Sequence, residues 1–133
     1  SVTLKANKPK LHTIRFDTHN RWRAGMPIQM VYRGAKYSIL DHFNKGIPEL
    51  EKCVSVQRIE IKYLTEEQEI AARGTSYYNP IIKIDGRFLE IAGQSKLARN
   101  DGFDHPTDNL THFLKWFNKD FIGIIIHWTD LRY

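Results

Sequence analysis

Hydrophobic positions predict a β-strand near the end of the chain, at residues 122–126. The run Ile122-Gly123-Ile124-Ile125-Ile126 is apolar at every position. A half-buried strand alternates apolar and polar side chains, so an uninterrupted apolar run is typical of a strand covered on both faces. We therefore expect this strand at the centre of the fold.

A second strand is predicted from residue 54 to residue 64, with a change of phase inside it. The apolar side chains move from Val54 and Val56 to Ile59 and Ile61, an odd step that crosses Gln57. A β-bulge absorbs one extra residue and helps to curl a strand. The pattern therefore predicts a bulge in this strand.

Shorter strands are predicted at residues 11–16, 28–32 and 81–84. The dipeptide Asp85-Gly86, which favours a two-residue hairpin turn, follows the last of them. We expect a hairpin there that continues through residues 87–89. The segment 34–48 fits either a hairpin or a turn and is left unassigned.

Two helices are predicted between these strands and the last one. The first covers residues 95–100 and ends at Asp101-Gly102, because glycine accepts the left-handed backbone at a helix end. The second is amphipathic, with apolar side chains at i, i+3, i+4 and i+7, namely Leu110, Phe113, Leu114 and Phe117. An acidic stretch at residues 66–69 is either helical or a loop.

Length and composition favour one domain covering residues 1–133. The 133 residues are 41% hydrophobic and contain one cysteine, Cys53, so no disulfide can form within the chain. The first residues lack the apolar stretch of a signal peptide, and residues 122–126 are too few to span a bilayer. We expect a soluble, cytoplasmic protein without a membrane segment, with Cys53 as a buried or inert thiol.

Positive charge is concentrated in the first third of the chain. Residues 1–46 hold nine Lys or Arg and two acidic residues, whereas residues 47–133 hold eleven Lys or Arg and thirteen acidic residues. Such an asymmetry favours a polyanionic partner, because each neutralised phosphate releases counterions. A solvated basic face without a partner is the alternative.

The predicted strand at residues 11–16 and its flank carry the candidate chemistry. Strand alternation places Thr13 and Arg15 on one face and His12 on the other, while Lys10 stands at the strand entrance. A hydroxyl beside a lysine of lowered pKa is a minimal pair of nucleophile and base. Asp101, at the predicted helix end, is the candidate acid.

A second candidate segment precedes the turn at residues 25–27. Trp22 stands between Arg21 and Arg23, and cationic and aromatic side chains together suit unpaired nucleotides. Trp22 equally suits a core position. The six histidines show no metal-ligand spacing and no phosphate-binding glycine loop is present, so we expect no metal and no cofactor.

In this order the motifs resemble the ASCH domain, a PUA-like module. Members of that family carry a lysine, a Thr-Ile-Arg strand, a basic and Trp-rich stretch before a glycine turn, an acidic Gly-Phe helix end, and an apolar last strand ending in tryptophan. Here these are Lys10, residues 13–15, 21–25, 98–103 and 121–128, which together span nearly the whole chain.

The resemblance implies an α+β fold: a PUA-like β-barrel of five to six strands with two covering helices. It also implies binding of RNA or a modified nucleoside in a cleft beside the first strand. The side chains expected to contact nucleic acid are Lys10, Arg15, Arg21, Trp22 and Arg23.

Catalysis is left open by the resemblance. Some members hydrolyse the amide of N4-acetylcytidine with a lysine, a threonine and a glutamate, which correspond to Lys10, Thr13 and Asp101. Asp101 is one methylene shorter than glutamate, a difference that a binding module tolerates better than an enzyme. An amidohydrolase of this kind, a ribonuclease and a small protein-interaction module are the alternatives to a binding domain.

Overall fold

The computed structural model of the chain describes residues 2–4, 11–17, 21–27, 30–32, 52–75, 78–103 and 108–133. Lys10 and the unassigned segment 34–48 lie outside these ranges. All other predicted site residues lie within them.

Five strands form one antiparallel sheet: β2 (His12–Arg15), β4 (Ser55–Lys62), β5 (Ile81–Ile84), β6 (Arg87–Phe88) and β7 (Phe121–His127). Across the sheet their order is β2-β7-β4-β5-β6. A separate parallel pair is formed by β1 (Val2–Leu4) and β3 (Met30–Tyr32). The described helices are α2 (Glu66–Ala71), α3 (Ile91–Asn100) and α4 (Asn109–Trp116).

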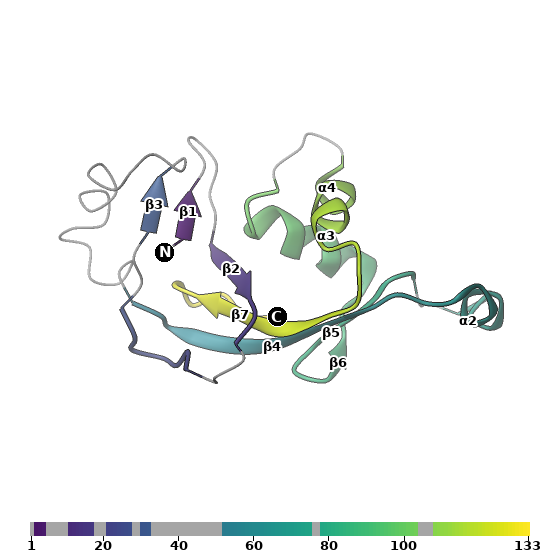
Figure 1. Ribbon diagram of the computed structural model, residues 1–133, viewed down its shortest axis with the longest axis horizontal. Helices are drawn as coiled ribbons and strands as arrows, with labels where there is room; N and C mark the ends of the chain where they lie inside the picture. Colours follow the sequence, from purple (N-terminus) through teal and green to yellow (C-terminus); the bar gives the residue numbers. More distant parts are fainter. Residues whose placement is uncertain are drawn as a thin grey trace.

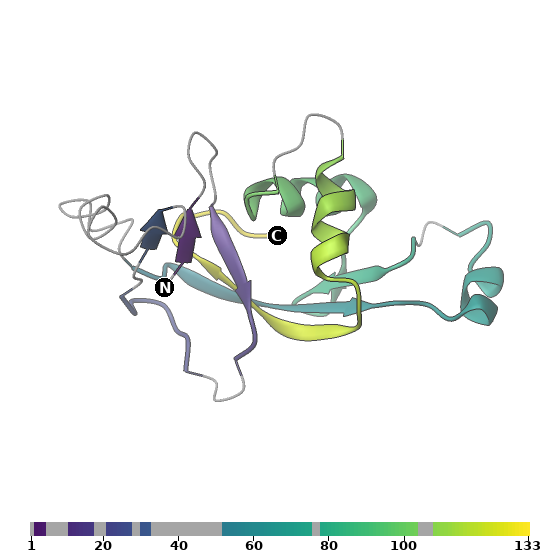
Figure 2. The ribbon, with the colours of Figure 1, turned by 45° about the horizontal axis from the view of Figure 1, so that its top comes forward.

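Only two of the three described helices pack against the sheet. In Figures 1 and 2, α3 and α4 lie against one face of the sheet, and α2 stands apart at the end of an extension beyond β4. The predicted α+β class and the two covering helices are therefore confirmed. None of the described helices has the length and apolar character needed to cross a membrane.

The predicted barrel is wrong, because the described sheet does not close on itself. Closure requires the two outer strands to pair, but β2 and β6 lie at opposite edges and β6 is only 2 residues long. The architecture is an open sheet covered by helices on one face.

The predicted bulge in β4 is also wrong. The pairing of β4 with β7 runs without interruption from Ser55 opposite His127 to Ile61 opposite Phe121. Gln57 is buried on the same face as Ile59, so a polar side chain occupies an inward position. The apparent change of phase comes from this polar residue and not from an extra residue in the strand.

The core lies between the helix-covered face of the sheet and α3 and α4. Its buried apolar residues are Ile14, Ile59, Ile61, Ile82, Ile84, Leu97, Ala98, Phe113 and Ile125. Strand β7 lies between β2 and β4, as expected of an apolar strand, and Ile125 and Ile126 are buried. Ile122, at the other end of β7, is 59% exposed, so burial on both faces holds for only part of the strand.

Gly123 allows β2 and β7 to approach closely. A Cβ atom at this position would lie 2.5 Å from the main-chain oxygen of Arg15 and 2.6 Å from the ring of Phe121. We expect Gly123→Ala to lower the free energy of unfolding by about 1–3 kcal/mol, because an added methyl group overpacks this contact. Urea unfolding of both proteins measures the change.

The matched control for this substitution is Ile122→Ala, at the exposed neighbouring position of the same strand. Ile122→Ala should lower the free energy of unfolding less than Gly123→Ala does. Equal stability of Gly123→Ala and the parent chain would contradict the packing described for β2 and β7.

Candidate functional site

The end of α3 lies against the beginning of β2. Gly102 adopts a φ of +92° and donates its N–H to the carbonyl oxygen of Arg99 at 3.0 Å, which ends the helix as predicted. The N–H of Leu11 donates to the carbonyl oxygen of Asn100 at 2.7 Å. These contacts place Asp101 beside the first residues of β2.

Polar side chains replace the apolar core at this end of the helix-covered face. In the strand register His12 lies opposite His127, and His127 lies opposite Ser55. We define the polar cluster as His12, Gln57, Asp101, His127 and Tyr133. The first four of these residues are buried, and Tyr133 is half-buried.

Three groups of the polar cluster form a hydrogen-bonded chain. The amide of Asn100 donates to the hydroxyl oxygen of Tyr133 at 3.0 Å, which leaves the hydroxyl hydrogen for Nε2 of His12 at 2.6 Å. With Nε2 as the acceptor, Nδ1 of His12 donates its N–H toward Oδ1 of Asp101, 3.3 Å away. A carboxylate, an imidazole and a hydroxyl in this order form the arrangement that activates a hydroxyl nucleophile.

Both the oxygen and the nitrogen of the Gln57 side-chain amide form hydrogen bonds. Its Oε1 accepts the N–H of Tyr133 at 2.8 Å and Nε2–H of His127 at 3.0 Å. Its Nε2 donates to the main-chain oxygen of Tyr133 at 2.8 Å and to Oδ2 of Asp85 at 2.9 Å. Because both partners of Nε2 are acceptors, the orientation of the amide is fixed.

This orientation also fixes the proton on His127. Nε2 must carry it, so Nδ1 presents a lone pair. Among the residues that the structure describes, neither Nδ1 nor the hydroxyl oxygen of the facing Ser55 has a hydrogen-bond partner. Burial, followed by the Coulombic effects of His12 and Arg132, lowers the pKa of His127 from 6.5 to about 3. His127 is therefore a neutral hydrogen-bonding group and not a base near neutral pH.

Burial also raises the pKa of two other weak acids in this region, Tyr133 and Cys53. It raises the pKa of Tyr133, with the nearby carboxylate of Asp101 acting in the same direction. The hydroxyl of Tyr133 is therefore neutral unless His12 takes its proton. Burial also raises the pKa of the Cys53 thiol, which is buried as predicted.

The structure does not bring together Thr13 and Asp101, the two predicted catalytic residues that it describes. Asp101 contacts His12 on the helix-covered side, whereas alternation along β2 directs Thr13 and Arg15 to the opposite face. Thr13 is buried and Arg15 is exposed. Thr13 and Asp101 thus do not share one site in this arrangement, and Lys10 lies outside the described residues.

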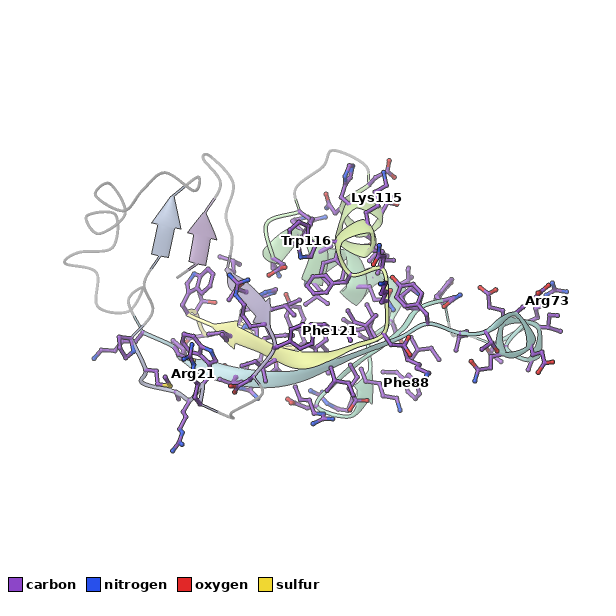
Figure 3. All side chains as sticks on the ribbon, in the orientation of Figure 1. Arg21, Arg73, Phe88, Lys115, Trp116 and Phe121 are labelled. Atoms are coloured by element: carbon purple, nitrogen blue, oxygen red, sulfur yellow. The ribbon has the colours of Figure 1, made fainter. Side chains whose placement is uncertain are left out.

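The basic segment at residues 21–23 lies on the side of the sheet away from α3 and α4 (Figures 1 and 3). The carboxylate of Asp17 accepts the N–H of Arg21 at 2.9 Å and that of Trp22 at 3.3 Å. The guanidinium of Arg21 lies 5.6 Å from the centre of the Trp22 ring. Arg21 and Arg23 are exposed and Trp22 is half-buried, so the arginines are available to a partner.

The same segment is attached to the sheet beyond the beginning of β4. The N–H of Gly25 donates to the carbonyl oxygen of Cys53 at 2.6 Å. The N–H of Cys53 donates in turn to the carbonyl oxygen of Met26 at 2.7 Å. Gly25 has a φ of +89°, which confirms the turn predicted at this glycine.

Apart from Asp101, the sequence analysis did not predict the members of the polar cluster, namely His12, Gln57, His127 and Tyr133. Their signal was present but weak. His12 had been placed on the face opposite Thr13, and Gln57 stood at an inward position of its strand. Tyr133 offered no periodicity, because it belongs to no helix or strand.

Neither a family model, nor a curated protein, nor a solved structure matches this chain. Among the described residues, no group of three or more His, Cys, Asp or Glu side chains is placed to hold a metal ion.

Proposed function

We propose that this chain binds RNA or a modified nucleoside, as expected of an ASCH-like domain. The exposed pair Arg21 and Arg23 on either side of Trp22 carries the proposal. Arginine contacts phosphate oxygens through several N–H groups, and an aromatic ring stacks on an unpaired base.

Two further observations support binding on this side of the sheet. Arg15 is exposed on the face away from the helices, the side on which residues 21–23 run. Asp17 holds the backbone of Arg21 and Trp22 in place, so less conformational freedom is lost on binding. Lys10 belongs to the same basic stretch of the sequence, where cations far outnumber acids.

Fluorescence anisotropy with a labelled single-stranded RNA tests the proposal. The affinity should fall linearly with salt on logarithmic axes, by a slope of about 0.7 for each phosphate contacted. A free modified nucleoside should compete for the same surface if the ligand is the base itself. Absence of binding at low salt, or binding that does not respond to salt, would contradict the proposal.

The second candidate is an amidohydrolase acting on N4-acylated cytidine, and the contact between His12 and Asp101 favours it. A buried carboxylate that holds an imidazole provides a means of removing a proton from a hydroxyl. The family pattern instead assigns the chemistry to Lys10, Thr13 and Asp101. The structure separates these two assignments, because Thr13 lies on the other face of β2.

Incubation with N4-acetylcytidine, followed by mass spectrometry, distinguishes the possibilities. Loss of cytidine release in His12→Gln but not in Thr13→Ala would assign the reaction to the polar cluster. Loss of cytidine release in Thr13→Ala and Lys10→Ala, but not in His12→Gln, would assign the reaction to Lys10, Thr13 and Asp101. Circular dichroism checks that each variant is folded, and no release by the parent chain would exclude this substrate.

A further inference from the structure

A pocket lies at the beginning of α3, away from both the polar cluster and the basic segment. We call it the hairpin pocket, because the strands of the β5–β6 hairpin form much of its wall. Its volume is about 250 Å³, and its apolar surface comes from Ile81, Ile82, Phe88 and Leu89. Gln94 of α3 lines the pocket and lies six residues before Asn100, so the helix separates these two residues by about 9 Å.

Two aromatic rings at the hairpin pocket are unusually exposed. Tyr78 is 53% exposed and Phe88 is 49% exposed, although both contribute to the lining. Nζ of Lys83 lies 4.8 Å from the centre of the Phe88 ring. Figure 3 shows Phe88 on the hairpin formed by β5 and β6. Exposed rings beside an apolar floor suit a planar ligand.

A mostly buried side chain in the lining adds a polar group. Gln94 is only 3% exposed, and its Nε2 donates to the carbonyl oxygen of Leu89 at 3.1 Å. Its Oε1 makes no hydrogen bond to any residue that the structure describes. The fully buried side-chain atoms without a partner in the described part of the chain are Oγ of Ser55 and Nδ1 of His127, so Oε1 of Gln94 is not one of them. It is an acceptor on a residue that lines the pocket.

The second polar group of the hairpin pocket is also an acceptor. Glu90 precedes the first residue of α3, and its side chain makes no capping hydrogen bond to the helix. Its carboxylate is exposed and lines the pocket. Two acceptors, one of them anionic, favour a ligand that donates N–H groups, and the negative charge disfavours a phosphate at this position.

We propose that the hairpin pocket binds an amino-substituted aromatic heterocycle, with the size and chemistry of an adenine or cytosine base. The ring stacks against Phe88 and Tyr78, and its exocyclic amine donates to Oε1 of Gln94 and to the carboxylate of Glu90. The volume is below the roughly 300–1,000 Å³ typical of sites for drug-sized ligands, so one ring system fills it. The inference goes beyond the proposed function, because it needs neither Arg21 nor Arg23.

Titration of the full chain with adenosine and with purine riboside, followed by NMR, tests the proposal. These nucleosides differ only by the exocyclic amine. Adenosine should shift the side-chain amide signals of Gln94 and the backbone signals of Ala92 and Gly93, and purine riboside should bind about tenfold more weakly. Shifts confined to residues 21–23, or no shifts at millimolar adenosine, would overturn the proposal.

Variants make the test specific to the hairpin pocket. Phe88→Leu keeps an apolar side chain but removes the stacking ring, so adenosine should bind about tenfold more weakly. Glu90→Gln should also weaken binding. Trp116→Ala, which removes an exposed ring on α4, is the control and should bind as the parent chain does. Unchanged affinity in Phe88→Leu would overturn the proposal, as would preferential binding of tetramethylammonium, which offers no N–H donor.

Discussion

Lowering the pH from 7 to 5 is expected to reduce the free energy of unfolding by ~2 kcal/mol through His127 alone. The ring is completely buried, and burial is the main cause that lowers its pKa from 6.5 to about 3. Unfolding restores the ordinary pKa, so the unfolded chain binds more protons than the folded chain between these two values. The contribution of His127 is complete above pH 6.5 and is lost as the pH falls toward 3.

Urea unfolding at several pH values, with the parent chain and His127→Gln in parallel, measures this contribution. Glutamine can still donate to Gln57 but does not titrate, so the variant should lose less stability between pH 7 and pH 5. The ring signals of His127 provide a direct check by NMR and should stay constant down to about pH 4. A midpoint near 6.5 for this ring in the folded protein would contradict the buried polar cluster.

Phe113→Ala is expected to lower the free energy of unfolding by about 3–5 kcal/mol. The Phe113 side chain is fully buried between α4 and the sheet. Its ring centre lies 5.5 Å from that of Phe103 and 4.8 Å from that of Phe117. Truncation removes the transfer free energy of the ring and leaves a cavity where the helix meets the sheet.

The control is Trp116→Ala, three residues further along the same helix. Trp116 is 75% exposed, so its removal tests loss of an aromatic residue from α4 without loss of core. Thermal or urea unfolding should show a much smaller change for Trp116→Ala. Similar effects of the two substitutions would show that α4 does not pack on the sheet through Phe113.

Local signals predicted several elements of this fold correctly. Asp85 and Gly86 both adopt positive φ values in the turn between β5 and β6, as their sequence indicated. The apolar run near the end of the chain forms an inner strand, and the amphipathic pattern around Phe113 forms α4. These features depend on a few neighbouring residues, so the sequence displays them directly.

The sheet closure and the polar cluster could not be predicted in the same way. A buried polar residue in β4 imitated a bulge, which supported a barrel that the structure does not form. The hydrogen bond between His12 and Tyr133 joins residues 121 positions apart, and no periodicity marks such a pair. Alternation had correctly separated Thr13 from His12, but only the structure shows that Asp101 lies on the His12 side.

The salt dependence of RNA binding, compared between the parent chain and Arg21→Ala/Arg23→Ala, tests the proposed function most directly. Arg73→Ala/Lys115→Ala removes two exposed cations elsewhere on the molecule and is the control (Figure 3). We predict weaker binding and a slope reduced by about 1.4 for Arg21→Ala/Arg23→Ala, with little change for the control. Equal slopes for the parent chain and Arg21→Ala/Arg23→Ala would contradict the proposed function.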